Sequence, residues 1–164
     1  MRWEEIFTVL GVINVAARAY GRVLKPPVYH EPQMTLDEFL REASRIKFFV
    51  AELSGEIVGV AGYEYVGDVA LIRHVYVKPE HQRRGIGSAL LKHLESLIRA
   101  EGRVRRLIVG TYRAAYWAIS FYQKHGFRLV ENPDAVLRKY YDIPDIQREN
   151  STASKNPSKP VRGG

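Results

Sequence analysis

The sequence of 164 residues contains no cysteine, which excludes disulfide bonds, thiolate catalysis and zinc sites with cysteine ligands. It also has no apolar run near the roughly 18 residues that a membrane-spanning helix needs. The first residues lack the basic start and apolar core of a secretory signal, so a cytoplasmic location is the default expectation. The five histidines are scattered without the spacing of metal ligands, and no metal is expected.

The motifs of several large enzyme classes are missing as well. No Gly-x-x-x-x-Gly-Lys-Ser/Thr segment occurs, which excludes a P-loop, and there is neither a Gly-x-Ser-x-Gly nucleophile elbow nor a His-Glu-x-x-His zinc helix. A dinucleotide fingerprint needs glycine or alanine three residues after its second glycine. Here Leu90 stands in that place after Gly85 and Gly87, so this fingerprint also fails.

Positive charge is abundant. The chain has 25 Lys and Arg residues against 18 Asp and Glu, a net charge of +7, and its pI is about 9.7. This charge favours anionic partners, either phosphorylated small molecules or nucleic acid. A basic surface that only contacts water has the same composition, so charge alone does not select among the three.

Apolar periodicity predicts helices that alternate with strands. Helices are predicted at 3–20 and, behind a capping box that begins at Thr35, at 36–46. Three strands joined by short turns predict an antiparallel meander; they lie at 48–53, 56–65 and 69–77. The later elements are a helix from 86 to Gly102, a strand at 106–111, a helix at 114–125, a strand at 127–130 and a helical segment at 135–141. The crossover through the helix after 86 makes strands 69–77 and 106–111 parallel.

The predicted fold class is therefore α/β, with a mixed sheet that is antiparallel in its first half and has helices on both faces. The length fits one domain. Residues 1–148 are assigned to this domain. Residues 149–164 are rich in Ser, Asn, Lys, Pro and Gly, and they are assigned to a polar, flexible tail.

A basic segment with two glycines joins the third strand to the next helix. It reads Val-Lys-Pro-Glu-His-Gln-Arg-Arg-Gly-Ile-Gly from Val77 to Gly87. It resembles the acetyl-CoA signature Gln/Arg-x-x-Gly-x-Gly/Ala of the GCN5-related N-acetyltransferase (GNAT) family. Further on, Ala118 to Phe127 resembles the family's Ala-Ile-x-x-Tyr-x-x-x-Gly-Phe element. The resemblance covers about residues 48–130.

The resemblance implies an enzyme that transfers the acetyl group of acetyl-CoA to a primary amine by direct attack. The two parallel strands would splay apart at the cofactor cleft, and Val75, Tyr76 and Val77 would bind the pantetheine arm. The pyrophosphate would lie on seven loop residues: Gln82, Arg83, Arg84, Gly85, Ile86, Gly87 and Ser88. Backbone N–H groups at a helix start suit such an anion, and glycine lets the backbone approach its oxygens.

The resemblance also assigns a catalytic acid. Tyr122 matches the family's tyrosine near the cofactor sulfur, where a phenol can protonate the departing thiolate. A place in the aromatic core is the alternative for this residue. The general base stays open, because Leu71 stands where many relatives have a glutamate. His74, Glu64 and water are the remaining candidates.

Two further positions depart from the family pattern. Ala115 replaces an asparagine that contacts the pantetheine arm, and Thr111 or Arg113 could replace that contact. Some family members end with an apolar strand, but the corresponding residues 150–154 are polar in this chain. The final strand is therefore expected to be short, at an edge or absent. The acceptor amine belongs to a small molecule or a protein. Two alternative functions stay open, a nucleic-acid-binding module and a non-catalytic acetyl-CoA sensor. The chain could in addition form a homodimer.

Overall fold

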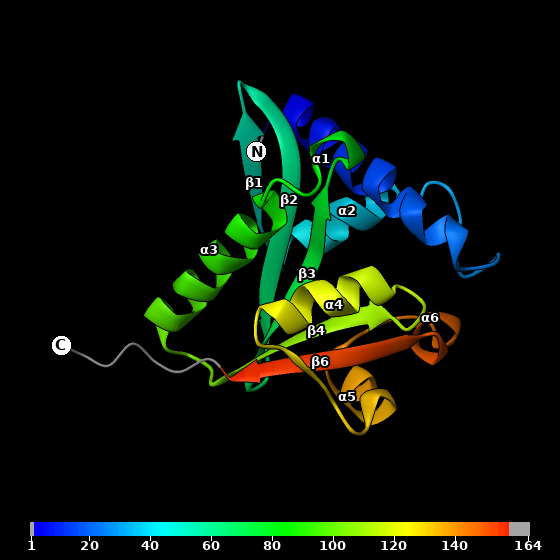
Figure 1. Ribbon diagram of the computed structural model, residues 1–164, viewed down its shortest axis with the longest axis vertical. Coiled ribbons are helices and arrows are strands. Elements are labelled where there is room, and N and C mark those ends of the chain that lie inside the picture. The colour runs from blue at the N-terminus through cyan, green and yellow to red at the C-terminus, as the bar shows by residue number, and fades with distance from the viewer. Residues whose placement is uncertain (1, 158–164) are drawn as a thin grey trace. The chain divides into compact units, whose positions relative to one another are not determined.

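A computed structural model of the chain describes residues 2–157. Their six strands form one mixed sheet in the order β1-β2-β3-β4-β6-β5, and β3 and β4 form its parallel pair (Figure 1). This confirms the predicted α/β class with a mixed sheet. The chain divides into two compact units, Met1–Glu64 with Arg73–Leu94 and Tyr65–Ile72 with Glu95–Gly164, and each is described by itself. Within residues 2–157, no helix has both the length and the apolar character to cross a membrane.

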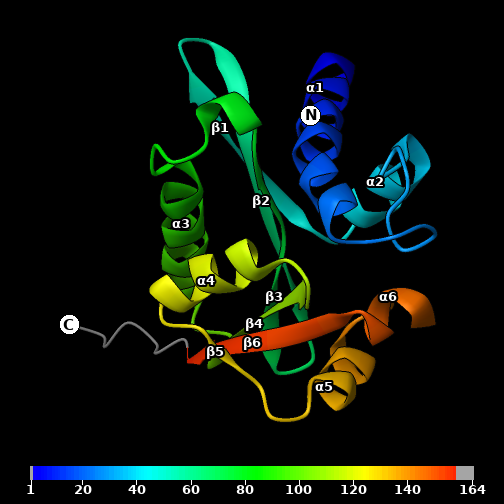
Figure 2. The same cartoon turned by 45° about the vertical axis from the view of Figure 1, so that its right-hand side comes forward.

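The first unit places helices on both faces of a β-hairpin. Its elements are α1 (Trp3–Ala17), the 3₁₀ helix η1 (Arg18–Arg22), α2 (Leu36–Ala43), β1 (Lys47–Leu53), most of β2 (Glu56–Val66), the second half of β3 (Val69–Val77) and the first half of α3 (Ile86–Glu101). Gly59 of β2 faces Ile86 and Leu90 of α3, whereas the next residue, Val60, packs with Val9 of α1. Figures 1 and 2 show α1 and α2 together on one side of the hairpin and α3 on the other.

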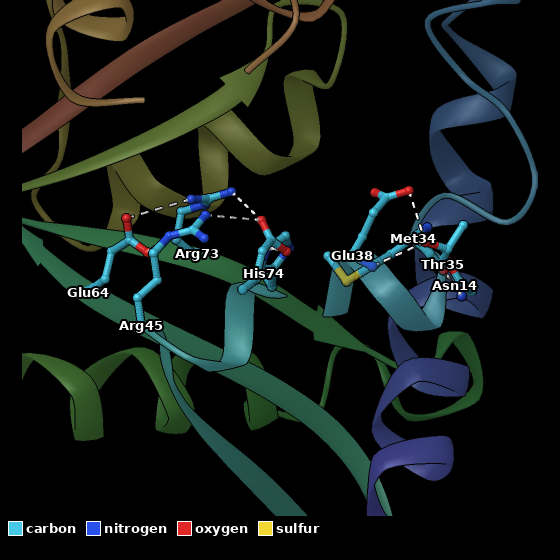
Figure 3. Close-up of polar contacts among 9 residues, drawn as sticks. Asn14, Met34, Thr35, Glu38, Arg45, Glu64, Arg73 and His74 are labelled. Atoms are coloured by element: carbon cyan, nitrogen blue, oxygen red, sulfur yellow. Dashed lines mark hydrogen bonds and ion pairs between the residues drawn. The ribbon is translucent and has the colours of Figure 1, made fainter. Parts of the chain in front are cut away.

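Short-range hydrogen bonds set the start of α2, as predicted. The backbone N–H of Glu38 donates to Oγ1 of Thr35 at 3.2 Å, and the Thr35 hydroxyl donates to Oε1 of Glu38 at 3.1 Å. Just before this capping box, the backbone of Met34 exchanges two hydrogen bonds with the amide of Asn14, of 2.8 and 2.9 Å (Figure 3). The entry to α2 is therefore fastened to α1.

The second unit is built around β4. Besides its shares of β2, β3 and α3, it contains β4 (Arg106–Tyr112), α4 (Tyr116–Lys124), β5 (Arg128–Leu129), α5 (Pro133–Tyr140), α6 (Asp145–Glu149) and β6 (Ser151–Pro157). Figures 1 and 2 show α4 and α5 on opposite sides of the β4–β6 pair. Leu71, Ile108 and Leu137 belong to the buried apolar cluster of this unit.

The assignment of 149–164 to a tail is wrong for residues 151–157. They form β6, which is seven residues long and lies between β4 and β5, so it is neither missing nor an edge strand. Residues Ser151 to Ser154 are buried; all four pair with β4, and Ser154 also pairs with Leu129 of β5. Near the other end of β6, Nδ2 of Asn156 donates to the carbonyl of His125 at 3.2 Å. Residues 158–164 of the predicted tail lie outside the described residues.

A Schellman motif ends α4 at the predicted glycine. Gly126 has φ +89°, and its N–H donates to the carbonyl of Gln123 at 3.1 Å. The N–H of Phe127 donates to the carbonyl of Tyr122, also at 3.1 Å. The rings of Tyr122 and Phe127 meet edge to face with centroids 5.5 Å apart, which is the hydrophobic contact that accompanies this motif. The helix end therefore fixes the place of Tyr122 in the second unit.

Replacing Gly126 by alanine should lower the free energy of unfolding by about 1–2 kcal/mol, because a residue with a Cβ is strained in the left-handed conformation. The added carbon would lie 3.6 Å or more from Asn156, so the loss arises from the backbone. Gly11→Ala is the matched control. Gly11 lies within α1 with open space around it, and alanine there should add about 0.5–1 kcal/mol. Urea denaturation of both variants tests the opposite signs; equal losses would contradict the Schellman assignment.

Candidate functional site

The loop predicted to bind the pyrophosphate begins where β3 ends. The N–H of Lys78 donates to the carbonyl of Val58 on β2 at 2.8 Å, and a short 3₁₀ helix, η2 (Pro79–His81), follows. Nε2 of Gln82 then donates back to the carbonyl of Val77 at 3.1 Å. Both ends of the turn are thereby held to the sheet, and the exposed residues that come next enter α3 from a fixed position.

Two residues of this loop are left-handed: Arg83 has φ +64° and Gly85 has φ +79°. Left-handed residues that alternate with right-handed ones turn successive N–H groups toward one side, which is an arrangement that binds anions. The first helical bond of α3 runs from Ala89 to the carbonyl of Gly85 at 3.0 Å. The N–H groups of Ile86 and Gly87 precede it and have no acceptor within the helix. Donors, helix dipole and two exposed arginines fit a pyrophosphate group.

A group of possible metal ligands lies beside the loop, but a lysine side chain already contacts one of them. Glu56, Glu80 and His81 bring one ligand atom each to within 4.8 Å of one another. Nζ of Lys78, however, lies 2.8 Å from Oε1 of Glu56 and lowers the pKa of that carboxyl through their hydrogen bond. The ammonium group of Lys78 thus already pairs with one of the three possible ligands, and we assign no metal to this group.

The proposed pantetheine segment belongs to the half of β3 that lies in the first unit. Val75, Tyr76 and Val77 are half-buried, and the ring of Tyr76 meets that of Tyr20 edge to face at 6.3 Å. Within the second unit, β3 pairs with β4 in parallel from Ala70 to Ile72. The predicted splay beyond that point and the contacts of the three residues with pantetheine stay predictions.

Tyr122 lies in the second unit and is 6% exposed. Its ring contacts Phe121, with centroids 5.1 Å apart, as well as Phe127. These contacts agree with an aromatic core position and do not test a catalytic one, so the role of Tyr122 as the acid stays a prediction.

Buried charges gather in the first unit, on the side of the hairpin that α2 covers. Oε1 of Glu42, from α2, accepts a hydrogen bond from Nη2 of Arg73 at 2.9 Å, and Oε2 of Glu42 lies 2.9 Å from Nε2 of His74. Glu64 on β2 is 7% exposed and lies between two guanidinium groups, 3.2 Å from Arg45 and 4.0 Å from Arg73 (Figure 3). We call these five residues the Glu42 cluster.

The backbone of β3 is distorted where it joins the Glu42 cluster. Neighbouring side chains of a regular strand point to opposite faces, yet Arg73 and His74 reach the same carboxylate. His74 makes this possible with φ +56°, a left-handed conformation that a non-glycine residue seldom adopts in a strand. Sequence analysis singled out His74 and Glu64 but missed Glu42, which is 31 residues from Arg73 and carries no local signal of the contact.

The pKa of Glu42 reflects these neighbours. Burial alone would raise it, but the hydrogen bond from His74 and the positive charges of His74, Arg73 and Arg45 together lower it below the usual value. Glu42 is therefore ionised at neutral pH. The Glu42 cluster then contains two carboxylates and two guanidinium groups, which balance in charge when His74 is neutral.

The other positions discussed from the sequence lie in the second unit. Leu71 is fully buried among apolar residues, so that position has neither a carboxylate nor a polar replacement. Ala115 is fully buried as well. Oγ1 of Thr111 is buried and has no hydrogen-bond partner among residues 2–157, whereas Arg113 is exposed. Their suggested contact with the pantetheine arm stays a prediction, as do nucleic-acid binding and a homodimer.

Comparison with known proteins gives one consistent family. Residues 12–127 match the acetyltransferase (GNAT) family. The chain is 27% identical over 118 residues to the spermidine N(1)-acetyltransferase of Thermoplasma acidophilum, covering 69% of this chain and 72% of that protein. It is 31% identical over 117 residues to acetyltransferase SG1711 of Sodalis glossinidius, covering 70% and 76%. The crystal structure of the PaiA N-acetyltransferase of T. acidophilum in complex with coenzyme A is similar with a TM-score of 0.70, at 18% identity and with 96% and 95% of the chains covered.

Replacing Glu42 by glutamine should destabilise the chain by about 1–3 kcal/mol at pH 7, because Arg73 loses the nearer of its two carboxylate partners in a site where the Glu42 side chain is only 16% exposed. The folded-state pKa of Glu42 is lowered, so its ionised form stabilises above the unfolded-state value of about 4.3. That contribution is lost as the pH falls through the folded-state pKa. The difference between wild type and E42Q should therefore shrink at about pH 3.

Asp134→Asn is the matched control for E42Q. Asp134 also contacts two arginines, Arg138 at 2.7 Å and Arg148 at 2.9 Å, but its side chain is 61% exposed. Because water screens exposed pairs, D134N should cost clearly less than E42Q. Urea denaturation of the three proteins at both pH values checks this. Equal losses, or an E42Q effect that does not change with pH, would mean that the Glu42 charge does not stabilise the first unit.

Proposed function

Because the chain belongs to the acetyltransferase (GNAT) family, we propose that it transfers the acetyl group of acetyl-CoA to a primary amine by direct attack in a ternary complex. The loop between β3 and α3 carries this proposal. Its left-handed residues, exposed arginines and free helix start form a donor set for pyrophosphate at the place where the family signature stands.

Each part of the site would have a separate task. Residues Gln82 to Ser88 would bind the pyrophosphate of acetyl-CoA through backbone N–H groups and arginine side chains. The backbone of Val75 to Val77 would orient the pantetheine arm, as the family pattern implies. Bound acetyl-CoA supplies the activated acetyl thioester. Tyr122 would donate its phenolic proton to the departing sulfur, which makes the thiolate a better leaving group.

We propose a polyamine as the first acceptor to test. The similarity to the spermidine N(1)-acetyltransferase supports this class. The first unit also has an open hollow with apolar walls and two carboxylates; it is lined by Glu5, Val9, Phe48, Val50, Glu52 and Ile57. Carboxylates beside apolar walls suit the alternating ammonium and methylene groups of a polyamine. Such local charge is needed, because the net charge of +7 does not attract a cation. A protein amine is the second acceptor class to test.

Replacing Gly85 by alanine should weaken acetyl-CoA binding about tenfold or more, because one lost hydrogen bond to a charged oxygen is worth roughly 1.5–3 kcal/mol. Gly55→Ala is the matched control. Gly55 lies in the β1–β2 turn, its φ of +81° is close to the +79° of Gly85, and neither glycine has an atom within 4 Å of an added Cβ.

Both glycine variants should lose similar stability, but only G85A should lose affinity for acetyl-CoA in isothermal titration calorimetry. Wild type at 100 times the dissociation constant should gain about 2.7 kcal/mol of stability from the ligand. If acetyl-CoA at millimolar concentration neither binds nor stabilises the wild-type chain, the proposed function is wrong.

Replacing Tyr122 by phenylalanine should reduce kcat about 100-fold with little change in acetyl-CoA affinity, because a general acid acts in the chemical step. Tyr116→Phe on the same helix is the control, since that side chain is 70% exposed and has no assigned role. Release of free CoA thiol with spermidine, other polyamines and peptides with free amines measures turnover. An unchanged kcat in Y122F would leave Tyr122 as a packing residue, and acetyl-CoA binding without turnover on any amine would indicate a sensor.

A further inference from the structure

We propose that the imidazole of His74 is the general base that takes the proton from the acceptor amine, and that Glu42 positions it. This inference rests on the proposed acetyltransfer and adds the proton acceptor that the family pattern leaves open at Leu71. All residues of the Glu42 cluster lie within the first unit.

The two ring nitrogens of His74 have different surroundings. Nε2 lies 2.9 Å from the carboxylate of Glu42, which favours the tautomer with the proton on Nε2. Nδ1 then carries the lone pair. The side chain is 13% exposed, so the imidazole is shielded from bulk water without being sealed. This arrangement leaves one nitrogen able to accept a proton.

Two aromatic rings stack with the imidazole of His74. Phe48 of β1 is stacked with His74 at 5.9 Å between centroids and 27° between planes. Tyr76 is stacked with His74 at 6.3 Å and 25°. Phe48 also lines the hollow with the two carboxylates, and Tyr76 belongs to the proposed pantetheine segment. The His74 ring is therefore packed against residues of both proposed binding regions of the first unit.

The charges around His74 suit a group that gains and loses a proton. The charged and titratable groups packed near it come from three elements and the turn after α2: Glu42 of α2, Arg45 of the turn, Glu64 of β2, and Arg73 and Tyr76 of β3. The two carboxylates and two guanidinium groups balance in charge, and the carboxylate of Glu42 lies 2.9 Å from the His74 ring.

The backbone at this position is a second sign of a special role. A non-glycine residue at φ +56° is uncommon, although histidine, asparagine and aspartate adopt this conformation more often than other side chains. Strained residues that persist in a fold are concentrated at functional sites. The distortion has a definite result here, since it brings His74 to the side of Glu42, where Arg73 already lies.

The other candidate bases are less suitable. Both oxygens of Glu64 face guanidinium groups, Oε2 that of Arg45 and Oε1 that of Arg73, so both are already engaged in ion pairs. Leu71 is a hydrocarbon in a buried apolar cluster. Water alone offers no fixed direction. Among the candidates, only His74 combines a basic nitrogen, a fixed orientation and partial exposure.

The transfer balances with these residues. Nδ1 of His74 takes one proton from the acceptor ammonium group, and the freed nitrogen lone pair forms the bond to the acetyl carbon as the carbon–sulfur bond breaks. The nitrogen loses its second proton and the departing thiolate gains one, so these two changes cancel. His74 releases the first proton to solvent. One ammonium group and one thioester thus give one amide, one thiol and one proton.

The decisive experiment is chemical rescue of His74→Gly. Glycine accepts φ +56° without strain, and its missing side chain leaves a ring-sized space beside Phe48 and Tyr76. With spermidine, or the amine that turns over fastest, kcat of H74G should fall about 100-fold or more. Millimolar imidazole should restore a large part of it, in proportion to the free-base fraction of imidazole as the pH is varied. An H74G variant that is folded, binds acetyl-CoA and is not restored by imidazole overturns the proposal.

A pH profile gives the second readout, which a purely structural role would not change. His74→Asn also tolerates the left-handed backbone and is not basic, so its kcat profile should lack the acidic limb that wild type shows. E42Q should lower kcat but keep that limb, because the ring is still basic and has lost only the carboxylate that positions it. His93→Gln, an exposed histidine of α3, is the control and should leave kcat unchanged.

Failure of this inference is distinct from failure of the proposed function. If wild type acetylates an amine and H74N keeps both its rate and its acidic limb, His74 is not the base although the enzyme is an acetyltransferase. If wild type binds acetyl-CoA and acetylates no amine, both statements are wrong. Acetyl-CoA affinity of H74G and H74N, measured by calorimetry, should equal that of wild type and shows that the variants are folded.

Discussion

The first unit depends on one buried carboxylate. Glu42 is near the end of α2, a helix of only eight residues that could not persist alone in water. Its two oxygens hold a guanidinium and an imidazole from successive residues of β3, and this shared contact is compatible only with the left-handed backbone at His74. Packing of Phe39, three residues earlier, into the apolar cluster fastens the same helix. Removal of the carboxylate would leave Arg73 with only the more distant Glu64 as a partner, and breaking such a pair is costlier than never having it.

Much of the fold could be predicted because its signals are local. The β1–β2 hairpin, the Thr35 capping box and the Gly126 helix end each depend on a few neighbouring residues whose side chains or dihedral angles decide the turn. β6 could not be predicted in this way. Its buried residues are short and mostly polar, and they are held in the interior by pairing with β4 along the whole strand, whereas β5 pairs only with Ser154 and Lys155. Hydrophobic patterning considers side chains only, so it does not detect burial that depends on backbone pairing.

The residues of the candidate site also differ in how well the sequence predicts them. The pyrophosphate loop is contiguous, so its residues could be named from the sequence, and the structure adds the left-handed angles at Arg83 and Gly85. His74 and Glu64 could be named as candidates for the base, but their surroundings could not. Glu42 meets β3 across a long sequence separation, and strand alternation argues against Arg73 and His74 sharing a partner until the distortion at His74 is known. A pattern that assumes regular strands fails where a strand is irregular for a purpose.

The position of β6 has a consequence for the order in which the chain can fold. The β1–β2 hairpin joins segments that are close in sequence and can form as soon as they are synthesised. β4, by contrast, pairs along its whole length with β6, and β5 pairs with β6 as well. Until residue 157 leaves the ribosome, β4 therefore exposes an open edge and α4 lacks the hydrogen bond from Asn156. The nascent chain would depend on chaperones most in that interval, and the second unit would gain its protection from aggregation last.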